Sequence, residues 1–130
     1  MYTATTRAIS VTVRPQYLPD QSDPATSRYV WAYHVRIENK GDTAVQLRSR
    51  HWKITDGLGR LTEVKGPGVI GKTPRLRPGE FFEYTSGTPL STSSGIMTGT
   101  YQMVGETGEN FDIEIPTFSL DTPAGSRQLN

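Results

Sequence analysis

The sequence contains no cysteine. Disulfide scaffolds, zinc sites built from cysteine and thiol nucleophiles are therefore excluded. Small extracellular domains usually depend on disulfides, so this absence favours a protein of the cytoplasm. The N-terminal segment MYTATTRAIS lacks the apolar core of a signal peptide, and no apolar run approaches the roughly 20 residues that cross a bilayer. We therefore expect a cytoplasmic protein with no membrane segment.

An excess of charge of either sign is also missing. Fourteen basic and thirteen acidic side chains leave a formal net charge of +1 over 130 residues. This balance disfavours a global attraction to nucleic acid or to an anionic membrane, while a local basic patch stays open. The length is that of one domain. The sequence predicts a single domain over residues 1–120 and a C-terminal tail over residues 121–130.

Helical periodicity is absent, and apolar residues alternate with polar ones instead. In residues 29–37 one face carries an aromatic and β-branched series: Tyr29, Trp31, Tyr33, Val35 and Ile37. This period of two is typical of half-buried strands, and 13 glycines and nine prolines separate such segments. About seven to eight antiparallel strands at this spacing predict an all-β fold, an immunoglobulin-like or fibronectin III-like β-sandwich.

One segment departs from this alternation. Val45 and Leu47 share a face, yet Trp52 and Ile54 have the opposite parity. If all four side chains face the core, one extra residue must lie between the two pairs. The sequence therefore predicts a β-bulge near Ser49–Arg50.

The segment GPGVIG, residues 66–71, has the G-x-G-x-x-G spacing of nucleotide-binding turns. In a dinucleotide-binding fold, a helix follows these glycines and presents its N-terminus to the phosphates. Here KTPRLRPG follows, where Pro74 and Pro78 leave no helical pattern, and the chain is too short for a kinase. A nest of backbone amides with basic flanks needs no helix. This candidate phosphate or anion site comprises Gly66, Gly68, Gly71, Lys65, Lys72 and Arg75.

The alternative for this segment is purely structural. The three glycines would then supply positive φ angles in a turn, and the cations would be ordinary solvated surface. The residues alone leave both interpretations open.

A second basic cluster lies beside the predicted bulge. Arg48, Arg50, His51 and Trp52 combine cations with an aromatic ring, a pattern that could form a binding surface for a nucleic-acid strand. In the alternative, Trp52 belongs to the core and the cations lie on the outer face of the strand. The balanced net charge makes nucleic acid the less favoured ligand.

Catalytic and metal-binding patterns are weak. His34 and His51 are the only histidines. They could be neighbours and join carboxylates around a metal, but exposed or hydrogen-bonded histidines are the simpler alternative. No G-x-S-x-G motif is present, and strand alternation explains the paired acids Asp112 and Glu114. The sequence predicts no enzyme, no catalytic residue, no metal and no cofactor.

Several blocks taken together resemble one family. YVWAYHVRIENKG, VQLRSRHWKITDGLGR, EVKGPGVIG, PGEFFEYTSGTPL and FDIEIPTFSL are similar to the bacterial ApaG family, over roughly residues 6–120. The resemblance implies a β-sandwich of the bacterial cytoplasm, often encoded beside a diadenosine tetraphosphate hydrolase. The family's second name, CorD, implies a link to cobalt resistance and magnesium efflux. Related eukaryotic domains, in F-box proteins and a DNA-polymerase-interacting protein, serve as interaction modules.

No enzymatic activity is established for that family, so the resemblance implies no catalytic residues. It does imply a pyrophosphate-binding role for the glycines of Gly66–Gly71. We predict a non-catalytic protein-interaction module whose loops or open sheet edge bind a partner, with an exposed apolar patch near Trp31, Trp52 or Phe82. An open edge would also permit a homodimer. The alternative prediction is nucleotide or pyrophosphate binding at the glycine loop.

Overall fold

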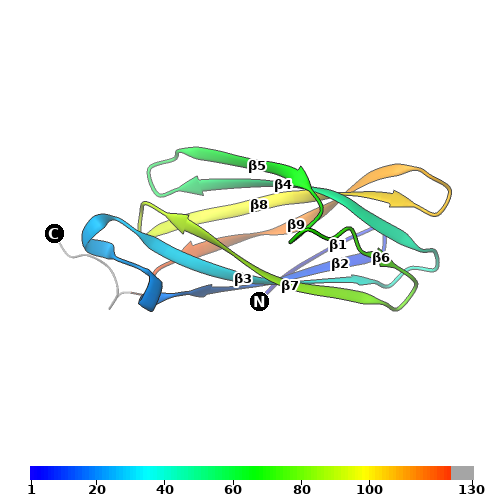
Figure 1. The fold of residues 1–130 in the computed structure, drawn as a ribbon, viewed down its shortest axis with the longest axis horizontal. Helices are drawn as coiled ribbons and strands as arrows, with labels where there is room; N and C mark the ends of the chain where they lie inside the picture. Colours follow the sequence, from blue (N-terminus) through cyan, green and yellow to red (C-terminus); the bar gives the residue numbers. More distant parts are fainter. Residues whose placement is uncertain (124–130) are drawn as a thin grey trace.

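The computed structural model describes residues 1–123, which form nine strands and two short 3-10 turns (Figure 1). The 3-10 turns cover Pro19–Gln21 and Pro24–Thr26. The strands are β1 (Tyr2–Thr6), β2 (Ile9–Tyr17), β3 (Tyr29–Asn39), β4 (Val45–Asp56), β5 (Leu61–Pro67), β6 (Arg75–Leu76), β7 (Phe81–Leu90), β8 (Ser94–Gly105) and β9 (Asn110–Asp121). Within these residues, no helix is long and apolar enough to cross a membrane.

The strands form two antiparallel sheets. One sheet has the order β1-β2-β3-β7, and the other has the order β5-β4-β8-β9 with β6 paired to β4. The two sheets pack face to face around one apolar core. The predicted all-β sandwich is confirmed, with nine strands where about seven to eight were expected.

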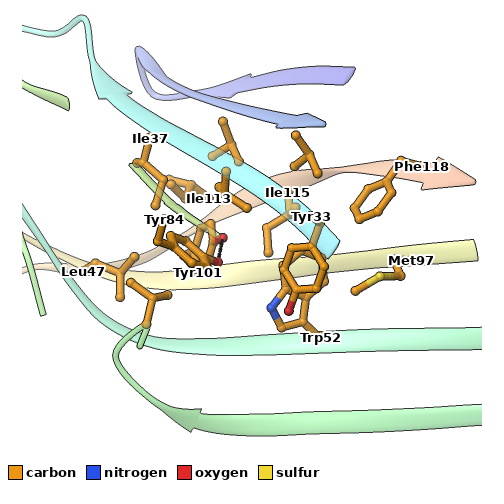
Figure 2. Close-up of a cluster of buried hydrophobic side chains, with 14 of the residues drawn as sticks. Tyr33, Ile37, Leu47, Trp52, Tyr84, Met97, Tyr101, Ile113, Ile115 and Phe118 are labelled. Carbon is orange, nitrogen blue, oxygen red and sulfur yellow. Dashed lines mark hydrogen bonds between the residues drawn. The ribbon is translucent and has the colours of Figure 1, made fainter. Parts of the chain in front are cut away.

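Alternation in the sequence builds the core. Every second residue of β3 from Tyr29 to Ile37 is buried, and the residues between them are more exposed. Trp52 of β4 lies between the sheets, with its ring centroid 6.4 Å from Tyr101 and 6.1 Å from Phe118 in edge-to-face geometry (Figure 2). Such pairs add specific attraction to the burial of large apolar surfaces.

The predicted bulge is present in β4. Its pairing with β8 shifts register between Leu47 and Ser49, so Arg48 is the extra residue. The bulge lies one residue before the predicted site. It turns Arg50, Trp52 and Ile54 onto the same inner face as Leu47, which explains the change of parity.

Three parts of the chain differ from the sequence prediction. β1 was not expected, because its threonines carry little apolar alternation. β7 continues to Leu90, through a segment that reads as a polar loop. β9 ends at Asp121, and the buried Thr122 donates its amide to the carbonyl of Ser93 at 2.9 Å. The folded domain therefore passes residue 120, and residues 124–130 of the predicted tail lie outside the described residues.

The two lateral sides of the sandwich differ. On one side β1 contacts β9: the hydroxyl oxygens of Tyr2 and Ser119 lie 3.2 Å apart, and the amide of Glu114 donates to Thr6 Oγ1 at 3.1 Å. On the other side β5 extends beyond the facing sheet. Val64 lies opposite the buried Trp52, yet it is 38% exposed. Strand β5 therefore forms an open margin of the fold (Figure 1).

Candidate functional site

The G-x-G-x-x-G segment ends β5 and forms a tight reverse turn. The amide of Val69 donates to the carbonyl of Lys72 at 2.8 Å, and the amide of Lys72 donates back to Val69 at 2.9 Å. The two residues between them have positive φ angles, 44° at Ile70 and 77° at Gly71. Two positive φ angles in a two-residue loop are typical of a type I′ turn. Gly71 is thus required by the turn, while the β-branched Ile70 is strained there.

Close backbone contacts explain the other two glycines. A Cβ on Gly68 would lie 2.5 Å from the carbonyl oxygen of Lys72, and φ at Gly68 is 62°. A Cβ on Gly66 would lie 3.1 Å from Nη1 of Arg50. Each glycine of the motif therefore has a structural role, either in backbone conformation or in the room it leaves.

The predicted nest of amides loses its basis in this geometry. The amides of Val69 and Lys72 close the turn, and the amide of Gly68 donates to the carbonyl of Arg48 at 2.8 Å. Strand and turn residues follow the glycines, so no helix N-terminus is added. These three amides cannot cradle a phosphate while they make these bonds. An anion site here would rest on the exposed side chains of Lys65, Lys72 and Arg75.

The residues of the second predicted site do not form one surface. Trp52 is only 2% exposed, so its place in a binding surface was wrong. Arg50 lies directly opposite the fully buried Tyr101 and therefore faces the inside of the sandwich. Arg48 is exposed at the bulge, and His51 points outward from the other face of the sheet. Alternation after the bulge separates these four side chains.

Arg50 fixes the glycine turn to the core. Its Nη1 donates to the carbonyl oxygens of Pro67 at 3.0 Å and Gly68 at 2.9 Å. Sequence reasoning missed this role, because the parity of Arg50 depends on the exact position of the bulge.

A group of tyrosine hydroxyls lies between the sheets near this guanidinium. The hydroxyls of Tyr84 and Tyr101 hydrogen-bond to each other (Figure 2). Burial raises the pKa of Tyr33, Tyr84 and Tyr101, and the charge of Arg50 lowers each pKa by a smaller amount. These phenols are uncharged in the folded protein at neutral pH.

The two histidines lie on opposite outer faces of the sandwich. His51 Nε2 lies 2.8 Å from Glu63 Oε1, and this hydrogen bond lowers the pKa of Glu63. His34 belongs to the other sheet, where its Nδ1 lies 2.9 Å from Thr85 Oγ1. The predicted neighbourhood of the two histidines was therefore wrong. Across residues 1–123, no group of three His, Cys, Asp or Glu could hold a metal ion.

Exposed apolar side chains gather along β5 rather than near the tryptophans. Trp31 and Trp52 are buried, and Phe82 is half-buried. Among the described residues, four of the seven exposed large apolar side chains belong to β5 or its flanking turns: Leu58 (72% exposed), Leu61 (57%), Val64 (38%) and Ile70 (55%). Within the same residues β5 pairs with β4 alone. We call this strand with its four apolar side chains the β5 edge.

Cations surround the end of the β5 edge at the glycine turn. Four exposed basic side chains lie in this part of the chain, and none takes part in a salt bridge of residues 1–123: Arg48, Lys65, Lys72 and Arg75. At the opposite end, Arg60 Nε is paired with Asp56 Oδ2 at 2.7 Å. The β5 edge therefore joins an apolar strand to a positively charged turn.

Comparisons with known proteins agree with this fold. A model of the ApaG domain family matches residues 19–105. The chain is 62% identical to Protein ApaG of Rhodospirillum centenum and 62% identical to Protein ApaG of Paramagnetospirillum magneticum, over 100% of each chain. It also resembles the crystal structure of the ApaA protein from Bordetella pertussis, with a TM-score of 0.87 and 53% identity over 89% of this chain and 94% of that one. The chain belongs to the ApaG family.

Proposed function

We propose that this chain is a non-catalytic protein-interaction module that binds an extended, acidic segment of a partner protein along the β5 edge. The observation that carries this proposal is an open edge strand of seven residues with exposed apolar side chains on the strand and in the turns on either side of it. Edge strands recruit partner strands by completing the hydrogen-bond ladder. The absence of cysteine favours the cytoplasm as the place of this binding.

The backbone of β5 offers hydrogen-bonding groups to a partner. Gly68 donates its amide to Arg48 of β4, and amides alternate in direction along an antiparallel strand. The amides of Thr62, Val64 and Gly66 therefore face β4. Those of Leu61, Glu63 and Lys65 face away from it and can receive a partner strand.

Side chains determine which partner strand would fit. Leu61 and Val64 lie on opposite faces of β5, so apolar groups on either face of an added strand find a contact. The cations around the glycine turn would attract acidic side chains and raise the rate of association at low ionic strength. Glu63 is the acidic residue of β5, and its carboxylate is hydrogen-bonded to His51.

We assign the link to magnesium and cobalt, which the family resemblance implies, to the partner. Apart from Glu63, whose carboxylate is bonded to His51, the β5 edge carries apolar groups and cations. Magnesium and cobalt prefer sets of several carboxylate, imidazole or other neutral and anionic ligands. An effect on metal tolerance would then follow from binding a protein that handles the ion.

An amide chemical-shift titration tests this function. The probe is a seven-residue peptide of alternating glutamate and valine with blocked ends, and the control ligand replaces glutamate by lysine. We expect saturable shifts in residues 61–67 with the acidic peptide only. Replacing Glu63 by proline removes one outward amide and leaves the ladder to β4 intact. Glu63→Pro should weaken binding at least about tenfold relative to the matched variant Glu63→Ala.

Other outcomes would contradict the proposal. Equal binding of both peptides, or equal affinity of Glu63→Pro and Glu63→Ala, would exclude an acidic strand at this edge. Saturable shifts around Lys65, Lys72 and Arg75 with pyrophosphate, and none with the peptide, would favour the anion-binding alternative. A homodimer through β5 would protect the same amides at high protein concentration without any ligand.

A further inference from the structure

A large polar groove lies on the outer face of the sheet that contains β4, β8 and β9. Its volume is about 880 Å³, and the start of β1 forms one wall. The polar side chains that line it include six from three adjacent strands: His51, Lys53, Thr98, Thr100, Asp112 and Glu114. The volume falls within the range of small-ligand sites, roughly 300–1,000 Å³. The groove lies on the outer face beside the β5 edge, and the hydrogen bond between His51 and Glu63 connects the two. The function proposed above does not use the groove's other side chains.

The strand register sorts the groups of this groove by charge. Lys53 of β4 lies opposite Thr98 of β8, and His51 of β4 lies opposite Thr100. Thr100 in turn lies opposite Glu114 of β9. Lys53 and the imidazole of His51 therefore follow β4, hydroxyls follow β8 and carboxylates follow β9. Neighbouring strands are about 4.8 Å apart, so the backbones of β4 and β9 lie about 10 Å apart. Lys53 is displaced from Glu114 by two residues along the strands, so their Cα atoms stand on the order of 10 Å from one another.

Among residues 1–123, Lys53 and Glu114 of the groove form no direct ion pair, although Lys53 lies opposite Glu63, whose carboxylate is bonded to His51. The outer face of the other sheet differs. There Arg36 pairs with Glu83 at 2.9 Å and lies 3.6 Å from Glu38. A ligand with one negative and one positive group could pair with Lys53 and Glu114 at the same time.

The hydroxyls of Thr98 and Thr100, on the strand between Lys53 and Glu114, are held in place by hydrogen bonds. Thr98 Oγ1 lies 3.0 Å from Thr117 Oγ1, and Gln102 Nε2 donates to Thr100 Oγ1 at 2.9 Å. Each threonine hydroxyl has further donor or acceptor capacity. These hydroxyls could hydrogen-bond to a ligand that has amide groups between its charged ends.

We infer that this groove binds a small zwitterion whose amine and carboxylate lie about 10 Å apart, the span of an extended tripeptide with free ends. Lys53 binds the ligand carboxylate. Glu114 binds the ligand amine, and Thr98 and Thr100 hydrogen-bond its peptide groups. A dicarboxylate would meet the acids of β9, and a diamine would meet Lys53, so the charge pattern selects a ligand with one charge of each sign.

The test is an amide chemical-shift titration of the whole chain with trialanine. We expect saturable shifts in residues 98–100 and at Glu114. Trialanine with both ends blocked should produce no saturable shift in these residues at about 10 mM, because it lacks both charges. No saturable shift with free trialanine at the same concentration would overturn the proposal.

Matched variants assign each end of the ligand. Lys53→Gln should weaken the binding of trialanine about tenfold and should not change the binding of trialanine amide, which lacks the carboxylate. Glu114→Gln should weaken both of these ligands, since each keeps the free amine. Lys40→Gln, an exposed change in the β3–β4 connection, is the control and should leave both affinities unchanged.

A different pattern of affinities in these variants would contradict the assignment of the ligand carboxylate to Lys53 and of its amine to Glu114. An equal loss for trialanine and trialanine amide in Lys53→Gln would show that Lys53 does not bind the carboxylate. Lys53 and Glu114 are both exposed, so neither variant should unfold the chain, and unchanged dispersion of the other amide signals verifies this.

Discussion

The guanidinium of Arg50 lies against the backbone of Gly66, where a Cβ would come within 3.1 Å of Nη1. The missing side chain leaves room for the arginine to reach the carbonyls of Pro67 and Gly68. The strand interior and the glycine turn are thereby connected by one residue. In this chain, the positions of the glycines in the G-x-G-x-x-G segment therefore follow from how its turn is bonded to the β-sandwich.

Removing this attachment should destabilise the protein. Arg50→Met keeps the length of the side chain but loses two hydrogen bonds from a charged donor to backbone carbonyls. We expect the free energy of unfolding in urea to fall by about 2 kcal/mol, the typical contribution of such bonds in a partly exposed site. Arg48→Met is the control; Arg48 is exposed at the bulge, and its loss should cost less than about 0.5 kcal/mol. Equal effects of the two variants would contradict the role of Arg50.

Alanine at Gly68 and at Gly71 should have unequal costs. Both glycines have positive φ, 62° and 77°, which costs an L-residue about 1–2 kcal/mol. Only Gly68 also faces a backbone oxygen, 2.5 Å from its built Cβ, while a Cβ on Gly71 meets nothing within 4 Å. We expect Gly68→Ala to lower the free energy of unfolding by at least about 1 kcal/mol more than Gly71→Ala. If these glycines served only to contact a ligand, both variants would unfold in urea with nearly the free energy of the unmodified chain, which would contradict their structural role.

Much of the fold could be predicted because it depends on local alternation. The parity change between Leu47 and Trp52 was enough to predict the bulge, since a buried face allows no other register. β1 could not be predicted, because a threonine-rich strand has almost no apolar period. Its pairing with β2 comes from the two-residue turn at Arg7 and Ala8, both with positive φ.

The candidate site was predictable in sequence position but not in geometry. The glycine motif and its cations do lie together in the structure, at the end of β5. The direction of an amide, however, depends on which residue pairs with which, and the spacing of glycines does not contain this information. The burial of Trp52 could not be predicted for the same reason. An aromatic residue beside cations is typical of a binding surface, and only the position of the facing sheet shows that this one is buried. The apolar β5 edge was missed because Leu58 and Ile70 lie in turns, where no periodicity marks them.

The strain at Ile70 should be removable. A type I′ turn favours Asn-Gly at its two central positions, and here Ile70-Gly71 occupies them with φ of 44° and 77°. Ile70→Asn should raise the free energy of unfolding by about 1 kcal/mol, because asparagine tolerates the left-handed region far better than a β-branched residue. The side chain is 55% exposed, so little buried apolar area is lost. If Ile70 also contacts the partner, the same variant should weaken binding of the acidic peptide while the protein becomes more stable. A loss of stability in thermal unfolding would contradict the assignment of strain.

The buried phenols predict a loss of stability at alkaline pH. Burial raises the pKa of Tyr84 and Tyr101 above the ordinary value of 10.0, whereas the unfolded chain returns them to that value. Above pH 10.0 the unfolded state therefore releases protons that the folded state keeps, and stability falls as pH rises toward the folded pKa. Below the unfolded pKa this contribution is fully present. For each such phenol, the free energy of unfolding should fall by about 1.4 kcal/mol more per pH unit.

The variant Tyr84→Phe separates this effect from other alkaline titrations. It removes one ionisable phenol and also the hydroxyl bonded to Tyr101, so its stability at neutral pH should be lower by about 1–2 kcal/mol. Its decline above pH 10.0 should nevertheless be shallower than that of the unmodified chain, because one fewer proton is released on unfolding. Guanidinium unfolding at a series of pH values measures both slopes, and lysine or arginine titration contributes equally to each. Parallel slopes would mean that Tyr84 ionises as readily in the folded protein as in the unfolded chain.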